Sequence, residues 1–114
     1  MLTKNFRMKR NTQFNYVFKK GQAFKHRQLM LVIYKKKYKH QKIGLVVSKK
    51  IGKSVQRNHV KRLIRESVRE YLPLISTDYD LIFVARQGVE SASFHDINKT
   101  ILELLKKSNA LKQN

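Results

Sequence analysis

The spacing of apolar residues along the chain is helical in three segments, where one face repeats every three or four positions. These segments predict helices over residues 12–20, from about 54 to 72, and from Ser93 toward the end of the chain. Thr12 stands where a side chain would cap the first helix, and Ser93 with Asp96 has the spacing of a capping box. We therefore expect three helices in this order.

Between these helices, β-branched and aromatic residues predict strands. The segments are bounded by Gly, Lys-rich or Asp-containing stretches, and they cover residues 22–26, 29–37, 43–47 and 79–85. The second strand has two apolar faces, because alternation places Leu29, Leu31 and Ile33 on one face and Met30, Val32 and Tyr34 on the other. One face must meet the core, and the other is either covered by a helix or presented to a partner.

The predicted elements follow one another in the order α-β-β-β-α-β-α, without repeats or linkers. A chain of 114 residues with 41% hydrophobic side chains can close one core. We therefore expect a single α+β domain over residues 1–114, a sandwich of helices and sheet whose last few residues fray.

Charge is divided very unevenly along the chain. The 26 Lys and Arg minus the 7 Asp and Glu give a net charge of +19. Residues 1–65 hold 20 of these bases and no acid (+20), whereas residues 66–114 hold 6 bases and all 7 acids (−1). Such self-repulsion is expected where a polyanion is the partner. Nucleic acid is the first candidate; an anionic membrane surface and a solvated basic surface are the alternatives.

Several functional classes lack the residues they need. The chain has no cysteine, which excludes disulfides, thiolate metal sites and cysteine nucleophiles. No apolar run approaches the ~18 residues of a membrane span, so we expect a soluble protein of the cytoplasm. Gly52-Lys53-Ser54 imitates a phosphate-binding loop, but Val47 stands where that motif needs glycine. A metal-dependent nuclease would need converging carboxylates, and the only pairs that share a face are Asp78 with Asp80 and Glu66 with Glu70. We expect neither a catalytic residue nor a metal site in the protein.

The predicted second helix has a basic side. Arg57, Lys61 and Arg65 succeed one another at steps of four residues beside the apolar stripe, and no acid stands at pairing distance along the helix. Phosphate contact is the favoured role of these three, with Asn58 and Arg62 beside them.

Aromatic residues lie among the basic ones. Phe14, Phe18 and Tyr34, with Val32, could form a floor on which unpaired bases stack, at ~1–3 kcal/mol per base. Core packing is an equally good role for the two phenylalanines.

Long motifs then indicate a family. The stretch VVSKKIGKSVQRNHVKRLIRE closely resembles the signature of the bacterial ribonuclease P protein component, and RMKRNTQFNYVFKKG and HRQLMLVIY resemble that family's opening helix and second strand. The resemblance implies a protein that joins a catalytic RNA, 1:1 and as a monomer, to remove the 5′ leader from precursor tRNA. It also implies that the RNA holds the active-site Mg²⁺ ions, and that the fold is similar to domain 2 of ribosomal protein S5, with a left-handed β-α-β crossover.

The resemblance also assigns residues to two sites. The side facing the catalytic RNA would comprise Lys49, Lys50, Lys53, Arg57, Asn58, His59, Lys61, Arg62 and Arg65. The cleft for the single-stranded leader would be lined by Phe14, Phe18, Val32 and Tyr34.

Two positions depart from the family pattern. His59 stands where the family has arginine, and a histidine is mostly neutral at pH 7, which weakens a phosphate contact or makes it pH-dependent. Val32 stands where the family commonly has an aromatic residue, and Tyr34 is the candidate substitute. A rival function shares the same charge and fold, namely a non-enzymatic structural RNA-binding protein such as a small ribosomal protein.

Overall fold

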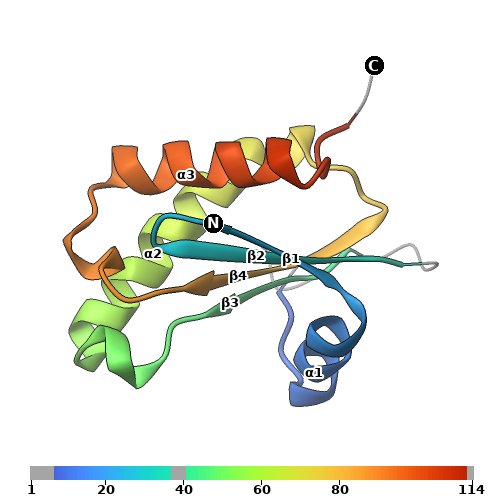
Figure 1. The fold of residues 1–114 in the computed structure, drawn as a ribbon. Coiled ribbons are helices and arrows are strands. Elements are labelled where there is room, and N and C mark those ends of the chain that lie inside the picture. Colours follow the sequence, from blue (N-terminus) through green and yellow to red (C-terminus); the bar gives the residue numbers. More distant parts are fainter. Residues whose placement is uncertain (1–6, 37–40, 113–114) are drawn as a thin grey trace.

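A four-stranded sheet separates two layers of helices (Figure 1). The computed structural model describes residues 7–36 and 41–112. In chain order the helices and strands are α1 (Asn11–Lys20), β1 (Gln22–His26), β2 (Leu29–Lys35), β3 (Ile43–Val46), α2 (Ser54–Tyr71), β4 (Tyr79–Ala85) and α3 (Phe94–Lys107). Short 3-10 turns, Lys49–Ile51, Leu72–Leu74 and Val89–Ser91, flank α2 and precede α3. The predicted α+β class and element order are confirmed.

Of the two helix caps predicted from the sequence, the structure has one and lacks the other. Ser93 Oγ accepts the backbone N–H of Asp96 at 3.1 Å, as predicted, and the hydrogen bonds that Asp96 receives from Ser93 lower the pKa of its carboxyl. The predicted cap at Thr12 is wrong, because α1 begins one residue earlier. There the side chain of Gln13 accepts the backbone N–H groups of Lys9 and Arg10 at 3.2 and 3.3 Å.

The strands are ordered β1-β2-β4-β3, and every pairing is antiparallel except that of β3 with β4. Two register pairs locate the sheet, Tyr34 opposite Asp80 and Gly44 opposite Ile82. The connection from β3 to β4 runs through α2, and it is the left-handed crossover that the resemblance implies (Figure 1).

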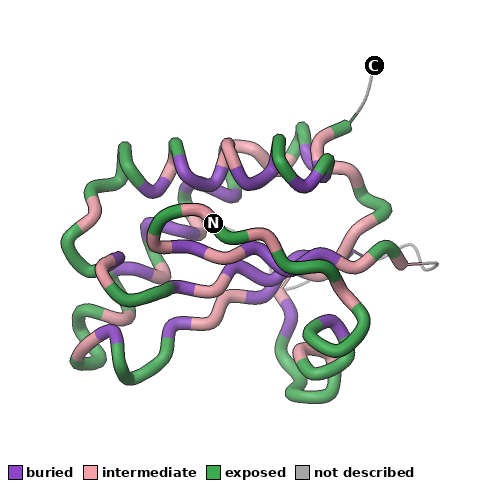
Figure 2. Tube along the Cα trace, in the orientation of Figure 1, coloured by how far each residue is buried: buried purple, intermediate pink, exposed green. Residues whose placement is uncertain are grey.

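Both faces of the sheet are buried, to different extents. Helices α2 and α3 cover one face, where Leu31, Ile64, Phe83 and Ile101 are fully buried in the main core (Figures 1 and 2). On the opposite face, α1 covers a smaller cluster of Met8, Val17, Val32 and Ile82. The two predicted apolar faces of β2 are therefore both used for packing.

The C-terminal end of the described chain is held to the fold by backbone hydrogen bonds. Leu111 forms a β-bridge with Ile75, and the backbone N–H of Lys112 donates to Leu74 at 2.7 Å. The predicted fraying of the last residues would therefore fall on residues 113–114, which lie outside the described residues. Among the helices described, none has the length and apolar character needed to cross a bilayer.

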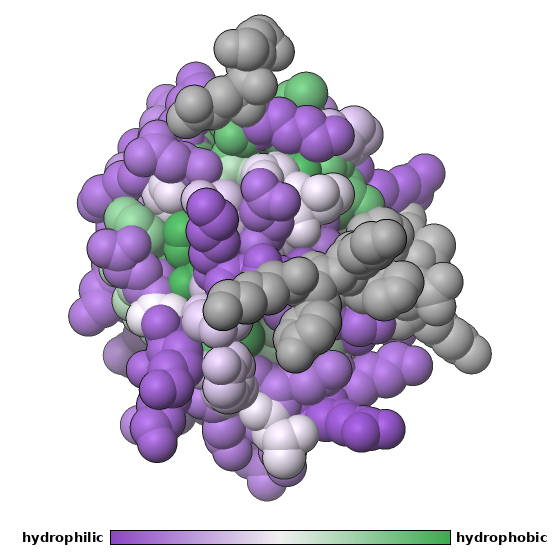
Figure 3. Space-filling model, turned by 90° about the vertical axis from the view of Figure 1, so that its right-hand side faces the viewer, coloured by the Kyte–Doolittle hydropathy of each residue, from purple (hydrophilic) through white to green (hydrophobic). Residues whose placement is uncertain are grey.

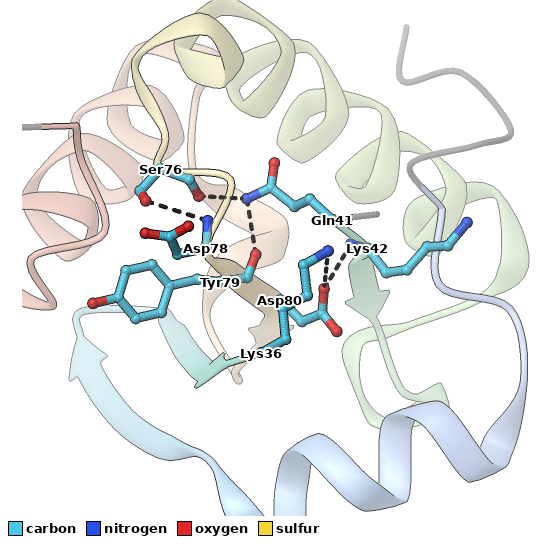
Figure 4. A network of polar contacts seen from close by, with 7 residues as sticks. All are labelled: Lys36, Gln41, Lys42, Ser76, Asp78, Tyr79 and Asp80. Carbon is cyan, nitrogen blue, oxygen red and sulfur yellow. Dashed lines mark hydrogen bonds and ion pairs between the residues drawn. The ribbon is translucent and has the colours of Figure 1, made fainter. Parts of the chain in front are cut away.

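A polar network fixes the segments on either side of the β2–β3 connection (Figure 4). Gln41 is buried, and its amide donates to the backbone oxygens of Ser76 and Tyr79, both at 2.8 Å. Asp80 Oδ1 accepts the backbone N–H of Lys42 at 2.8 Å and lies 3.4 Å from Lys36 Nζ. The Lys36 side chain is only 5% exposed, so Asp80 neutralises an ammonium that water hardly reaches.

Replacing Asp80 should therefore destabilise the fold. Asp80→Ala leaves the buried ammonium of Lys36 without its carboxylate and removes the acceptor of the Lys42 N–H, at an expected cost of about 2–4 kcal/mol. Chemical denaturation measures this loss, and adding Lys36→Met should restore part of it. Equal stability of Asp80→Ala and the parent chain would show that the ion pair contributes nothing.

Candidate nucleic-acid interface

The loop before α2 is shaped by one glycine and closed by two side chains. Gly52 has a φ of 150°, a backbone angle that residues other than glycine rarely adopt. The backbone N–H of Lys53 donates to Gln56 Oε1 at 3.0 Å, and Arg57 Nε donates to the Gly52 carbonyl at 3.2 Å. Arg57 thus holds the loop against the first turn of α2, which keeps the loop's lysines beside the helix.

The nine residues predicted to face RNA gather in this loop and the helical turns after it. Exposed side chains are Lys49, Lys50, Lys53, Asn58, His59 and Arg62, and half-buried ones are Arg57, Lys61 and Arg65. His59 Nδ1 lies 3.5 Å from a guanidinium nitrogen of Arg62. The opposite side of the same turns is buried through Val60 and Ile64, so the core orients the basic side outward.

An arginine far away in sequence joins this surface. The backbone N–H of Met8 donates to Ile43 at 2.9 Å, and Arg7 forms a parallel bridge with Ile43, so residues 7–8 lie along the outer edge of β3. A hollow of about 90 Å³ results, lined by Arg7, Met8, Ile43, Leu45, Lys61 and Arg65. Sequence reasoning missed Arg7, because only the pairing with β3 brings it near α2.

The three cations of this hollow have no counter-charge among the described residues. No ion pair there includes Arg7, Lys61 or Arg65, and Arg7 Nε is buried without a hydrogen-bond partner. The pKa of Arg65 is lowered, first by desolvation and then by the charge of Arg7. Partly desolvated like charges around an apolar floor favour an oxyanion, so the arrangement suits a phosphate group.

Sulfate should therefore stabilise the free protein at this hollow. At ten times its dissociation constant, a bound anion adds about 1.4 kcal/mol, or several degrees in Tm. Arg65→Met should lose most of the gain in Tm seen when chloride is exchanged for sulfate at constant ionic strength. Arg69→Met, on an exposed turn of the same helix, is the control and should keep the gain. An equal gain in both variants would mean that sulfate acts only through general exclusion from the surface.

The second predicted site lies on the other face of the sheet, beside α1. Val17 of α1 is 2% exposed and faces the sheet. Phe14 packs on Gly44 so closely that a Cβ there would lie 2.5 Å from its ring. Phe18 is 42% exposed, whereas Val32 is 3% exposed. Phe18 can therefore offer a ring to a base, and Val32 cannot.

Tyr34 lies on a different flank of α1 from Phe18. At 100° per residue, Tyr16 and Phe18 project to opposite sides of Val17. The ring of Tyr34 meets that of Tyr16 edge to face, with centroids 5.2 Å apart and the two hydroxyl oxygens at 3.1 Å. The structure thus brings Phe14, Val32 and Tyr34 into one packed cluster but does not place Tyr34 beside Phe18. Tyr16 was not predicted, because it is off the apolar stripe of α1.

Comparison with known proteins shows the family of the chain. The family model described as Ribonuclease P matches residues 2–109. The chain belongs to the ribonuclease P protein family. Ribonuclease P protein components of Clostridium kluyveri and Oceanobacillus iheyensis are 39% and 40% identical to it, over 94% and 97% of this chain and 97% and 93% of the relatives.

Solved RNase P proteins share the fold. The structure of the Staphylococcus aureus RNase P protein matches with a TM-score of 0.88 at 32% identity, covering 96% of this chain and all of that one. The Thermotoga maritima RNase P protein matches with a TM-score of 0.80 at 26% identity, over 89% and 96% of the two chains. The chain is accordingly the protein subunit of ribonuclease P, an endoribonuclease of tRNA processing, and its partner is the RNase P RNA.

Proposed function

We propose that this RNase P protein assists removal of the 5′ leader from precursor tRNA by holding two RNAs at once. The basic loop and α2 bind the catalytic RNA, and the Phe18 flank of α1 binds the single-stranded leader. The observation that carries the proposal is the convergence of Arg7, Lys61 and Arg65 on one hollow without a carboxylate among the described residues. A ribosomal role is disfavoured by the family match over residues 2–109.

The anchor on the catalytic RNA follows from charge and exposure. Six exposed side chains and three half-buried ones follow one another between Lys49 and Arg65, in the loop and the first three turns of α2. Each phosphate contact releases a counterion, so an interface of this kind binds tightly at low salt and loses affinity steeply as salt rises. The buried side of α2 fixes the spacing of these groups, which favours a defined docking position over diffuse attraction.

The leader site follows from the apolar face that α1 leaves open. Phe18 is exposed beside Phe14, over a sheet surface on which Met30, Val46 and Val84 are only half-buried. Unpaired bases can stack on such aromatic and apolar surface whatever their sequence. In this chain Phe18, with Phe14 beside it on α1, is the proposed stacking residue, and the buried Val32 supports α1 from below without meeting the base.

The protein contributes positioning to the reaction. Holding leader and catalytic RNA in one geometry lowers the entropic part of the barrier without a catalytic side chain. Across residues 7–36 and 41–112, no three His, Asp or Glu side chains converge as metal ligands. We propose that Mg²⁺ is bound by the RNA, that the complex contains one copy of each subunit, and that it acts in the cytoplasm.

The leader site can be tested on Phe18. In the reconstituted holoenzyme, Phe18→Ala should weaken binding of precursor tRNA about tenfold, because one base loses its stacking partner, and should leave mature tRNA unaffected. Phe94→Ala, which removes a comparably exposed ring from α3, is the matched control and should change neither affinity. Equal losses for precursor and mature tRNA would remove the leader assignment.

The catalytic-RNA side can be tested on His59. His59→Arg places a permanent charge on the exposed side of α2, so affinity for the RNase P RNA should rise at low salt. The slope of log K against log salt should steepen by about one. His95→Arg adds the same charge on α3 and should have little effect. If both variants behave alike, the attraction is general and α2 is not the docking face.

A further inference from the structure

The flank of α1 opposite Phe18 carries a second aromatic surface. Tyr16 is 50% exposed, and its edge-to-face contact and hydroxyl hydrogen bond with Tyr34 join α1 to β2. A ring pair held at two points loses little freedom when a ligand stacks on it, which is the property that favours tyrosine in binding surfaces. These rings are therefore a preformed surface and not a pair of mobile side chains.

Tyr34 of this pair also lines a hollow of about 470 Å³ at the end of the sheet, which extends past Ile33 to Ser108 at the end of α3. Its lining includes Lys20, Gln22, Tyr34, Lys35, Tyr79 and Asn109. The volume is in the range of small-ligand sites, and the lining combines two ammonium groups, phenol rings and amides. Such a set can bind a phosphate and the polar edge of a base together.

The charges around the hollow favour an anion. Among the described residues, no ion pair includes Lys20 or Lys35. Of the nearby acids, Asp80 is paired with Lys36 and accepts the Lys42 backbone N–H, and Asp78 is exposed. Hydrophilic side chains dominate the face shown in Figure 3, and apolar ones form only small patches between them. The lining of the hollow itself supplies both cations and phenol rings, the two features that suit RNA.

We propose that the Tyr16–Tyr34 pair and this hollow form a second subsite for single-stranded RNA, which takes a further segment of the leader. The proposal rests on the proposed function of the Phe18 flank. The leader is the favoured occupant because only α1, about 10–12 Å across, separates the Tyr16–Tyr34 pair from the Phe18 flank, and Tyr34 connects the pair to the hollow. The hollow at Arg7, proposed to bind catalytic RNA, lies at the outer edge of β3. The hollow at Tyr34 is lined from β1, β2, β4 and the ends of α1 and α3, and has no residue of β3 in its lining.

Amide chemical shifts of the full chain, titrated with an oligouridylate, test whether the subsite binds RNA. The amides of Gln22, Lys35 and Asn109 should shift, and they should still shift in Phe18→Ala. Tyr16→Ala should weaken the binding reported by these amides about fivefold or more, whereas Tyr16→Phe, which keeps the ring, should retain most of it. Absence of these shifts, or their loss in Phe18→Ala, would overturn a separate subsite.

Precursor tRNAs with two leader lengths test which RNA occupies it. In the holoenzyme, Tyr16→Ala should weaken binding about fivefold for a long leader and leave a leader just long enough for the Phe18 flank unchanged. An equal loss for both leaders would assign the subsite to the catalytic RNA and overturn the leader claim. Phe18→Ala should weaken both, so a failure of the Phe18 site is distinguishable from a failure of this one. Thermal unfolding of each variant verifies that the fold is intact.

Discussion

The packing of α1 across the sheet is the contact on which the functional surface depends. Val17 rests over Val32 and Ile82, and Gly44 leaves room for the ring of Phe14. Because one helix of ten residues covers this face, apolar surface is left on both sides of it. The helix therefore stabilises the second face of the sheet and at the same time divides it into two flanks of different chemistry.

The opposite face provides the stability that such a charged chain requires. Residues 1–65 carry +20, and mutual repulsion opposes their compaction. The main core, with Leu31, Phe83 and Ile64 fully buried, offsets that cost with ordinary hydrophobic burial. Since α2 contributes to this core on one side and carries cations on the other, the same helix both stabilises the fold and exposes its charge.

Local patterns in the sequence predicted the elements well. The alternation in β2, the cap at Ser93 and the run of cations on α2 are each set within a few residues, and the structure has all three. Thr12 failed as a cap because α1 begins at Asn11, so that Thr12 lies inside the first turn, and Gln13 accepts the backbone N–H groups of Lys9 and Arg10 instead. Local alternatives of this kind have similar energies, so sequence alone separates them poorly.

Local patterns of this kind could not predict the contacts between segments that are distant in sequence. Arg7 reaches Lys61 and Arg65 only because the chain before α1 pairs with Ile43. Tyr34 was correctly placed on the face with Val32, but the direction of α1 across that face decides which ring Tyr34 meets. Periodicity assigns a residue to a face of its own element, whereas the neighbour on that face depends on how elements cross.

The bridge between Arg7 and Ile43 also bears on solubility. Strand β3 is at one edge of the sheet, and unpaired edge strands are templates for aggregation. Residues 7–8 occupy the beginning of that edge and bring a charged side chain to it. An anion that neutralises Arg7, Lys61 and Arg65 would hold this protective segment in place. Preparations freed of RNA and multivalent anions would then be the ones most prone to self-association through β3.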